Sequence, residues 1–204
     1  MTLSRQQIRA KFGDDYIAND RTFRMGIDQR FTSRIAERFA GRRVLETCTG
    51  AGFTTIALAR RVSHVVTVEI DPENQAQARR NVAKAGLEDR VTFVTGDVLE
   101  YGTLDQSPPF DAAFMDPDWG ESGLEHLCHF RNSSTHPPAD VLLERTLGLT
   151  PDVAIVLPPV TDVGEFAGLP THERQHLYFG ECHELYCLFF GRLSRSSGKT
   201  ELRL

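Results

Sequence analysis

The stretch Arg43-Val-Leu-Glu-Thr-Cys-Thr-Gly-Ala-Gly52 decides how this chain is expected to fold. Residues 43–48 read as a short buried strand and residues 53–62 as a helix, so the glycines form a tight strand-to-helix turn. Because Gly50 and Gly52 lack side chains, the backbone can approach a ligand closely there, and a helix N-terminus offers free N–H groups. The turn therefore predicts a ligand site at the carboxyl end of this strand.

Strands and helices alternate on both sides of the turn. The expected helices are 31–40, 72–84 and 138–147, and the expected further strands are 65–70, 91–95, 112–115 and 152–157, with a hairpin over 176–190. This order predicts an α/β fold, a Rossmann-like, doubly wound, mostly parallel seven-stranded sheet that ends in an antiparallel hairpin. Residues 1–40 are expected to form a short N-terminal lobe of the same domain, and residues 41–204 its main part.

Composition limits the class of protein. The 204 residues are 40% hydrophobic and 25% charged, which suits one soluble domain with a sizeable core. No apolar run approaches the ~20 residues that span a bilayer. The N-terminus has no apolar signal core, and the four cysteines lack C-x-x-C spacing. We therefore expect reduced thiols, no membrane association and a cytoplasmic protein.

The net charge of −5 is unevenly distributed and disfavours a protein that coats nucleic acid. Residues 1–45 hold ten Lys and Arg against five Asp and Glu (+5), and residues 191–204 hold four against one (+3), which leaves −13 between them. Basic termini could guide a phosphate-bearing substrate. They could equally be the solvated ends of the chain, and charge alone does not decide between the two.

Acidic side chains follow the second and third strands. Glu69 lies seventeen residues after Gly52, where a carboxylate can accept both hydroxyls of a ribose, and Asp97 could accept an adenine amino group. The third glycine of a dinucleotide fingerprint is missing, and the acidic Glu46 before the turn suits a sulfonium donor. S-adenosylmethionine, with S-adenosylhomocysteine as product, is therefore favoured over a nicotinamide cofactor. A tight turn without a ligand is the third interpretation.

Asp116-Pro-Asp-Trp119 follows the strand-like run 110–115. Asp116 and the Pro117 carbonyl could accept the two N–H groups of a flat amine while Trp119 stacks on its ring. An amine held in this way directs its lone pair at an electrophilic methyl group. The motif predicts an N-methyltransferase, the alternative being an Asp-Pro turn beside a core tryptophan.

Five motifs together resemble one known family. They are residues 45–57, 68–72, 96–97, 116–120 and 156–159, and in order and spacing they resemble the RNA cap guanine-N2 methyltransferase family over residues 31–191. The resemblance implies acceptor contacts at Asp116, Pro117 and Trp119. The full set of expected donor contacts is Glu46, Thr49, Gly50, Gly52, Glu69, Asp97 and Val98.

The chain departs from the family at the acceptor. Ser-Pro-Pro-Trp of cap enzymes is Asp-Pro-Asp-Trp here, so Asp118 adds a carboxylate that could bind a positively charged substrate. Residues 21–26 do not match the segment that helps to form the cap pocket. Pro158 either lines the acceptor site or ends a strand. Guanine N2 of an RNA or a guanine nucleotide is the expected acceptor. Adenine, a glutamine amide, a small metabolite, or a donor-binding RNA module without turnover remain the alternatives.

His126, Cys128 and His129 lie close together in sequence, and Cys182-His183 could join them. Their spacing matches no zinc finger, so no metal site is predicted.

Overall fold

The computed structural model describes residues 3–105, 107–120 and 127–204. The chain divides into two compact units, Met1–Asp111 and Ala112–Leu204, and each is described by itself. Within the described residues, no helix combines the length and the apolar character needed to cross a bilayer.

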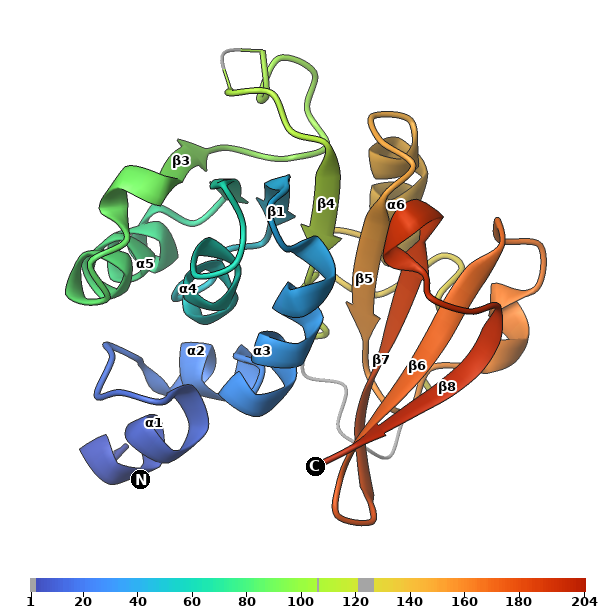
Figure 1. Cartoon of the computed structure of the whole chain (residues 1–204), viewed down its shortest axis with the longest axis horizontal. Coiled ribbons are helices and arrows are strands. Elements are labelled where there is room, and N and C mark those ends of the chain that lie inside the picture. The colour runs from blue at the N-terminus through green and yellow to red at the C-terminus, as the bar shows by residue number, and fades with distance from the viewer. Residues whose placement is uncertain (1–2, 106, 121–126) are drawn as a thin grey trace. The chain divides into compact units, whose positions relative to one another are not determined.

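The first unit is built on three parallel strands in the order β3-β2-β1 (Figure 1). The strands are β1 (Arg43–Thr47), β2 (His64–Glu69) and β3 (Val91–Thr95). The helices are α1 (Arg5–Phe12), α2 (Asp20–Met25), α3 (Gln29–Ala36), α4 (Phe53–Ala59) and α5 (Pro72–Lys84), with short 3-10 turns at Glu37–Phe39 and Glu88–Arg90. Helix α5 begins where the sequence predicts, because Asp71 caps it by accepting from the Glu73 N–H and Pro72 supplies its first residue.

Residues 3–40 of the expected N-terminal lobe contain α1, α2, α3 and the 3-10 turn Glu37–Phe39, and they belong to this unit. The Phe12 ring stacks on the Phe53 ring with centroids 3.5 Å apart. Asn81 of α5, which is fully buried, donates from Nδ2 to the carbonyls of Ile17 and Ala51 and accepts from the Ile17 N–H. The lobe and the glycine turn are therefore joined through one side chain.

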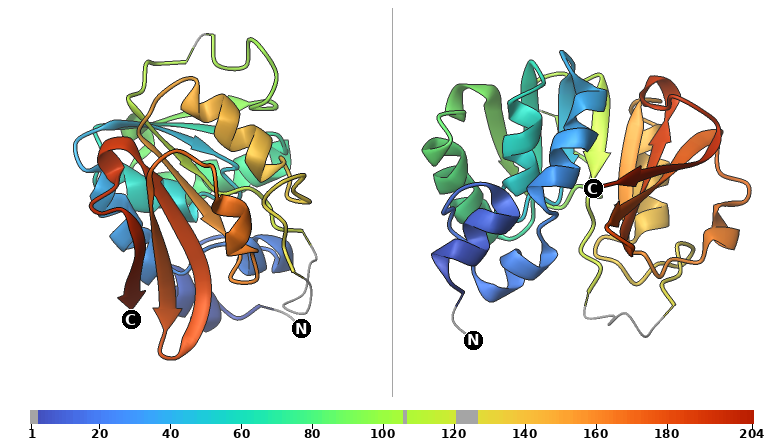
Figure 2. Two further views of the ribbon diagram at one scale, coloured as in Figure 1. Left: turned by 90° about the vertical axis from the view of Figure 1, so that its right-hand side faces the viewer. Right: turned by 60° about the horizontal axis from the view of Figure 1, so that its bottom comes forward.

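The second unit holds five strands in the order β4-β5-β7-β6-β8 (Figures 1 and 2). They are β4 (Ala112–Met115), β5 (Val153–Leu157), β6 (His172–Phe179), β7 (Cys182–Phe190) and β8 (Gly198–Arg203), with helix α6 (Ala139–Leu147) and 3-10 turns at Val163–Phe166 and Gly191–Leu193. β4 is parallel to β5 and β6 to β8, whereas β7 runs antiparallel to both β5 and β6.

The α/β class, the mostly parallel pairing and the terminal hairpin are confirmed. The described residues form eight strands rather than the expected seven, because the sequence did not indicate β8. Its sequence, Gly-Lys-Thr-Glu-Leu-Arg, has no apolar run, as is usual for an edge strand that keeps charges on its free side.

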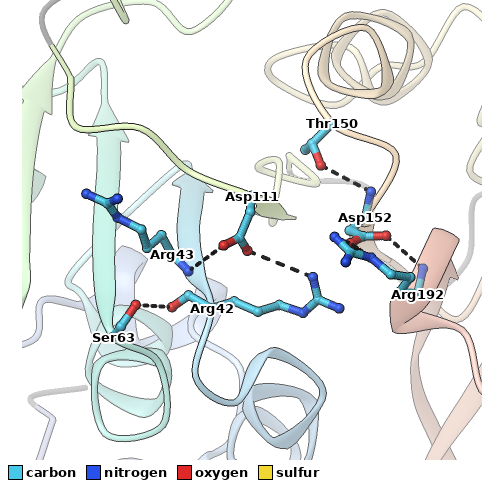
Figure 3. A network of polar contacts seen from close by, with 7 residues as sticks. All are labelled: Arg42, Arg43, Ser63, Asp111, Thr150, Asp152 and Arg192. Atoms are coloured by element: carbon cyan, nitrogen blue, oxygen red, sulfur yellow. Dashed lines mark hydrogen bonds and ion pairs between the residues drawn. The ribbon is translucent and has the colours of Figure 1, made fainter.

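A buried carboxylate, paired with an exposed arginine, fixes the start of β5 (Figure 3). Asp152 is 1% exposed and accepts from the Arg192 backbone N–H and from its Nε, both at 2.7 Å. Gly191 has φ +58°, and a Cβ there would lie 2.4 Å from Asp152 Oδ1, so only glycine fits. In the first unit, Asp111 holds the start of β1 by accepting from the Arg43 N–H at 3.5 Å and pairing with Arg42 at 3.8 Å (Figure 3).

Candidate functional site

The carboxyl ends of β1, β2 and β3 meet at Glu69. Its Oε2 accepts from the Gly50 N–H at 2.8 Å, its Oε1 from the Asp71 N–H at 3.0 Å, and its carbonyl from the Gly96 N–H at 3.0 Å. The structure therefore brings together the glycine turn, the end of β2 and the Gly96-Asp97 pair, three of the motifs that the sequence analysis named.

Glu69 is only 6% exposed, and burial raises the pKa of its carboxyl, while the N–H groups of Asp71 and Gly50 act in the opposite direction. A carboxylate has about four lone-pair sites, so two bonds to the backbone and one to the Asn74 side chain leave room for a ribose hydroxyl. The two backbone bonds also fix the direction in which this carboxylate points.

The two glycines of the turn have different surroundings. Gly50 has φ +54°, and an added Cβ would meet no atom of the described residues within 4 Å. Gly52 has φ +80°, and its Cβ would lie 3.0 Å from the Cβ of Ala78 on α5. Gly52 thus allows a close approach between α5 and the turn, whereas Gly50 leaves open space beside it.

Glu46 and Thr49 belong to a buried hydrogen-bonded cluster under the turn. Oε2 of Glu46 accepts from Thr55 at 2.6 Å and from Thr67 at 2.7 Å, and Thr67 also bonds Thr49 at 2.5 Å. Glu46 is 1% exposed, and burial raises the pKa of its carboxyl to about 7 against the two threonine bonds. Sequence reasoning did not find Thr55 and Thr67, although a threonine within each apolar element was a visible signal.

Asp97 and Val98 follow β3. Asp97 Oδ1 accepts from the Leu99 N–H at 2.8 Å, and Val98 is buried. Near the same strand end, Gln75 of α5 is 5% exposed and its Oε1 accepts from Thr95 at 2.6 Å. Its Nε2 is buried and meets no hydrogen-bond partner among the described residues. Sequence reasoning missed Gln75, since nothing marks a glutamine inside a polar helix as a ligand contact.

These features suit an adenosyl group. The space beside Gly50 admits a ligand, and the Glu69 carboxylate can accept from hydroxyls. The Nε2 group of Gln75 can donate a hydrogen bond. All three come from residues of this unit whose positions the strands and α5 fix.

The Asp116-Pro-Asp-Trp119 motif, expected from the sequence to contact the acceptor, lies in the second unit directly after β4. Asp116 is half-buried and Pro117 buried. Asp118 exchanges two backbone hydrogen bonds with His136, at 2.9 and 2.8 Å, and its Oδ1 accepts from the Gly120 N–H at 3.0 Å. Trp119 is partly buried beside this bridge in the chain. The motif is thus a backbone-paired turn in which Asp118 makes a local bond.

The loops that follow β4 and β5 are joined to each other. Cys128 donates its N–H to the Val160 carbonyl at 3.0 Å and accepts from the Asp162 N–H at 2.9 Å. The Pro158 carbonyl accepts from the N–H and the hydroxyl of Thr161. Pro158 is buried and ends β5, so the structure shows it turning the chain, and its contact with an acceptor stays a prediction.

The residues weighed as metal ligands do not form a cluster where they are described. His129 pairs with Glu165 at 2.6 Å, Cys128 is buried and Cys182 exposed, whereas His126 lies outside the described residues. In residues 3–105, 107–120 and 127–204, no group of three His, Cys, Asp or Glu could hold a metal ion.

Comparison with known proteins places this geometry in context. The family model for RNA cap guanine-N2 methyltransferase matches residues 41–185. Trimethylguanosine synthase of Schizosaccharomyces pombe is 31% identical over 155 residues, which cover 72% of this chain and 64% of that protein. Catechol O-methyltransferase of Mycobacterium tuberculosis is 40% identical over 92 residues, 44% of this chain and 42% of that protein. The chain thus covers less than two thirds of either relative.

Among solved structures, a methyltransferase candidate from Porphyromonas gingivalis W83 superposes with a TM-score of 0.74. The superposition covers 95% of this chain and 49% of that chain, at 19% sequence identity. This likeness shows a shared fold over nearly all of the present chain.

Proposed function

We propose, because the chain belongs to the RNA cap guanine-N2 methyltransferase family, that it methylates an exocyclic amine, namely guanine N2 of an RNA or of a guanine nucleotide. Membership makes it an S-adenosylmethionine-dependent methyltransferase. The observation that carries the proposal is the Asp116-Pro-Asp-Trp119 turn directly after β4, inside the matched residues.

In the proposal, the first unit binds the methyl donor. S-adenosylmethionine supplies an electrophilic methyl group on a positively charged sulfur. In the proposal, Glu69 accepts from a ribose hydroxyl, Asp97 and Gln75 face the adenine, and the backbone at Gly50 borders the open space. Glu46 lies under the turn and accepts hydrogen bonds from Thr55 and Thr67. In the proposal it therefore positions the turn and does not contact the donor.

Acceptor binding falls to the second unit. Asp116 and the Pro117 carbonyl accept the two amino hydrogens, and Trp119 stacks on the purine. A neutral amine already has a lone pair, so little base catalysis is needed, and its proton leaves for solvent or Asp116 after the methyl has moved. Positioning and fixed dipoles supply most of the acceleration.

Asp118 decides between a neutral and a cationic base. Its Oδ1 accepts from the Gly120 N–H, and in the proposal its negative charge favours a cationic base such as a 7-methylguanine. Asp118→Asn keeps a carbonyl oxygen for that bond and removes the charge. We expect it to reduce the preference for 7-methylguanine over guanine; an unchanged preference would make Asp118 a turn residue alone.

The proposal is tested with labelled donor and separated pools of RNA, DNA, protein and metabolites. We expect label in RNA or guanine nucleotides, released as N2-methylguanosine on digestion to nucleosides. Label on adenine, on a glutamine amide or on a metabolite would replace the acceptor named here. Binding of S-adenosylhomocysteine without transfer to any pool would point to a module without turnover.

A further inference from the structure

One face of the sheet formed by β6, β7 and β8 gathers rings and cations, as the strand register shows. Alternate side chains of a strand share a face, and directly paired residues on neighbouring strands point the same way. The register therefore places one set of side chains on this surface, here called the β6 face. It includes His172, Arg174, His176, Tyr178, His183, Tyr186, Lys199, Glu201 and Arg203, together with the buried Leu188 and Phe190 of β7.

The rings of the β6 face touch one another. The centroid of His183 lies 5.2 Å from that of His176, 4.9 Å from that of Tyr178 and 4.4 Å from that of Tyr186. Tyr178 and His183 remain half-exposed, whereas His176 and Tyr186 are each 8% exposed. The inner pair supports the outer pair, so two rings are held in place at the hairpin end of β6 and β7, with the Arg203 guanidinium 4.1 Å from the centroid of the Tyr178 ring.

Positive charge surrounds these rings. Arg174, Lys199 and Arg203 lie on the face with one carboxylate, Glu201, which pairs with Lys199 at 2.8 Å and with Arg203 at 3.0 Å. Glu181, at the hairpin, lies 3.7 Å from Arg203. Arg174 and Lys199 therefore form the more positive end, although the whole chain carries −5.

The positive charges of the β6 face also affect the pKa of His176. Burial and then the neighbouring cations, with Lys199 and Arg174 among them, lower the pKa of His176 to about 4. The Arg174 Nε donates to Nε2 of this ring at 3.2 Å, which requires that nitrogen to be unprotonated. The ring is thus neutral at physiological pH and supports the outer rings without adding a charge.

A hollow opens at the start of β6. Its volume is about 370 Å³, within the range of small-ligand sites, and its lining includes Phe166, Leu169, His172, Arg174 and Gly198. Phe166 and His172 meet edge to face with centroids 6.3 Å apart. One wall is apolar and aromatic, and the other carries a guanidinium, a combination that suits a flat base with a phosphate attached.

We propose that the β6 face and its hollow bind an unpaired stretch of RNA, resting on the proposed function in that this RNA is the substrate. One base enters the hollow, phosphodiesters lie along Arg174 and Lys199, and a base further along the RNA stacks at Tyr178 and His183, four to six residues further along β6. Single-stranded RNA is bound in this manner, through rings that take unstacked bases and cations that follow the backbone.

The test measures fluorescence anisotropy of a labelled oligouridylate of about twelve nucleotides, which offers no guanine to the acceptor site. Lys199→Glu is compared with Arg61→Glu, the same charge change at an exposed position of the first unit. Tyr178→Ala is compared with Phe179→Ala, whose ring is 46% exposed on the other face of β6. Thermal unfolding verifies that all four variants fold.

We expect the wild type to bind and both Lys199→Glu and Tyr178→Ala to weaken binding about tenfold at ~50 mM salt, with both controls within about twofold. Lys199→Glu should also flatten the dependence of affinity on salt. Equal affinities of test and control variants, or no binding by the wild type, would overturn the proposal. Methyl transfer to a guanine mononucleotide, measured in parallel, shows separately whether the proposed function fails.

Discussion

The glycine turn of the first unit and the loops after β4 and β5 of the second are held in different ways. Side chains hold the turn: the Glu69 carboxylate reaches the Gly50 N–H, and Glu46 joins Thr55 and Thr67. The loops combine backbone pairs, as between Asp118 and His136, with local side-chain bonds such as that from the Thr161 hydroxyl to the Pro158 carbonyl. Side-chain bonds need particular residue types at particular spacings, which the sequence shows. Backbone pairs form between residues of any type, so the sequence does not show them.

In the proposal, the first unit binds the donor and the second unit binds the acceptor. The largest expected effect tests this separation at Asp116. Asp116→Ala should lower turnover about a hundredfold or more, as the loss of a positioned polar contact does elsewhere, with unchanged affinity for S-adenosylhomocysteine. Single-turnover kinetics and calorimetric titration measure the two quantities. Asp89→Ala, an exposed position of the first unit, serves as the control. A parallel loss of donor affinity would mean that the two sites are not separate.

The buried cluster under the turn should show itself in the pH dependence of stability. Because the folded-state pKa of Glu46 is about 7 against an ordinary 4.5, the folded protein holds a proton that the unfolded chain releases. Its stabilising contribution is complete below pH 4.5 and is lost as pH rises through 7, by on the order of 3 kcal/mol.

Glu46→Gln should remove that loss, since an amide oxygen can still accept from Thr55 and Thr67. Denaturant unfolding between pH 4.5 and 8 measures the difference between the two proteins. Parallel curves would show that Glu46 ionises normally and that the cluster does not depend on its proton.

Glu69→Ala tests the donor side directly. It removes a carboxylate that bonds the turn and, in the proposal, the ribose, and charge-assisted hydrogen bonds contribute ~1.5–3 kcal/mol each. Affinity for S-adenosylhomocysteine should fall at least tenfold, as measured by calorimetry. Glu73→Ala, an exposed first-turn residue of α5, should leave it unchanged. Unaltered binding by Glu69→Ala would remove Glu69 from the donor site.

The smallest expected effects come from the two glycines of the turn. Gly50→Ala faces open space and costs roughly 1–2 kcal/mol for its left-handed backbone, so it should stay folded and lose donor affinity severalfold. Gly52→Ala meets Ala78 at 3.0 Å as well and should mainly lower the melting temperature. Equal effects of the two variants on binding and stability would show that both glycines serve packing alone.

The sequence predicted regular elements best where apolar runs or caps marked them. β3 and β4 match residue for residue, and α5 does so because Asp71 and Pro72 define its start. β6 begins earlier than expected, at His172, because its first half, His-Glu-Arg-Gln, is entirely polar and shows no apolar pattern. β8 was missed for the same reason, since backbone pairing with β6 defines it.

In the candidate site, too, the sequence predicted some features and not others. The spacing from the turn to Glu69 predicted their meeting, because parallel neighbouring strands bring their carboxyl ends to one edge. The bridge from Asp118 to His136 and the unmatched amide of Gln75 were not predictable, since both depend on tertiary contacts between residues of ordinary type.

Asn81 has a consequence for how the first unit opens and closes. Its side chain satisfies backbone groups of Ile17 in the lobe and of Ala51 in the turn, so neither segment can detach without leaving a buried amide unsatisfied. Lobe and turn therefore belong to one cooperative unit of local unfolding. A ligand that stabilises the turn accordingly slows hydrogen exchange at the Ile17 amide. A change that loosens the lobe weakens ligand binding by the same coupling free energy.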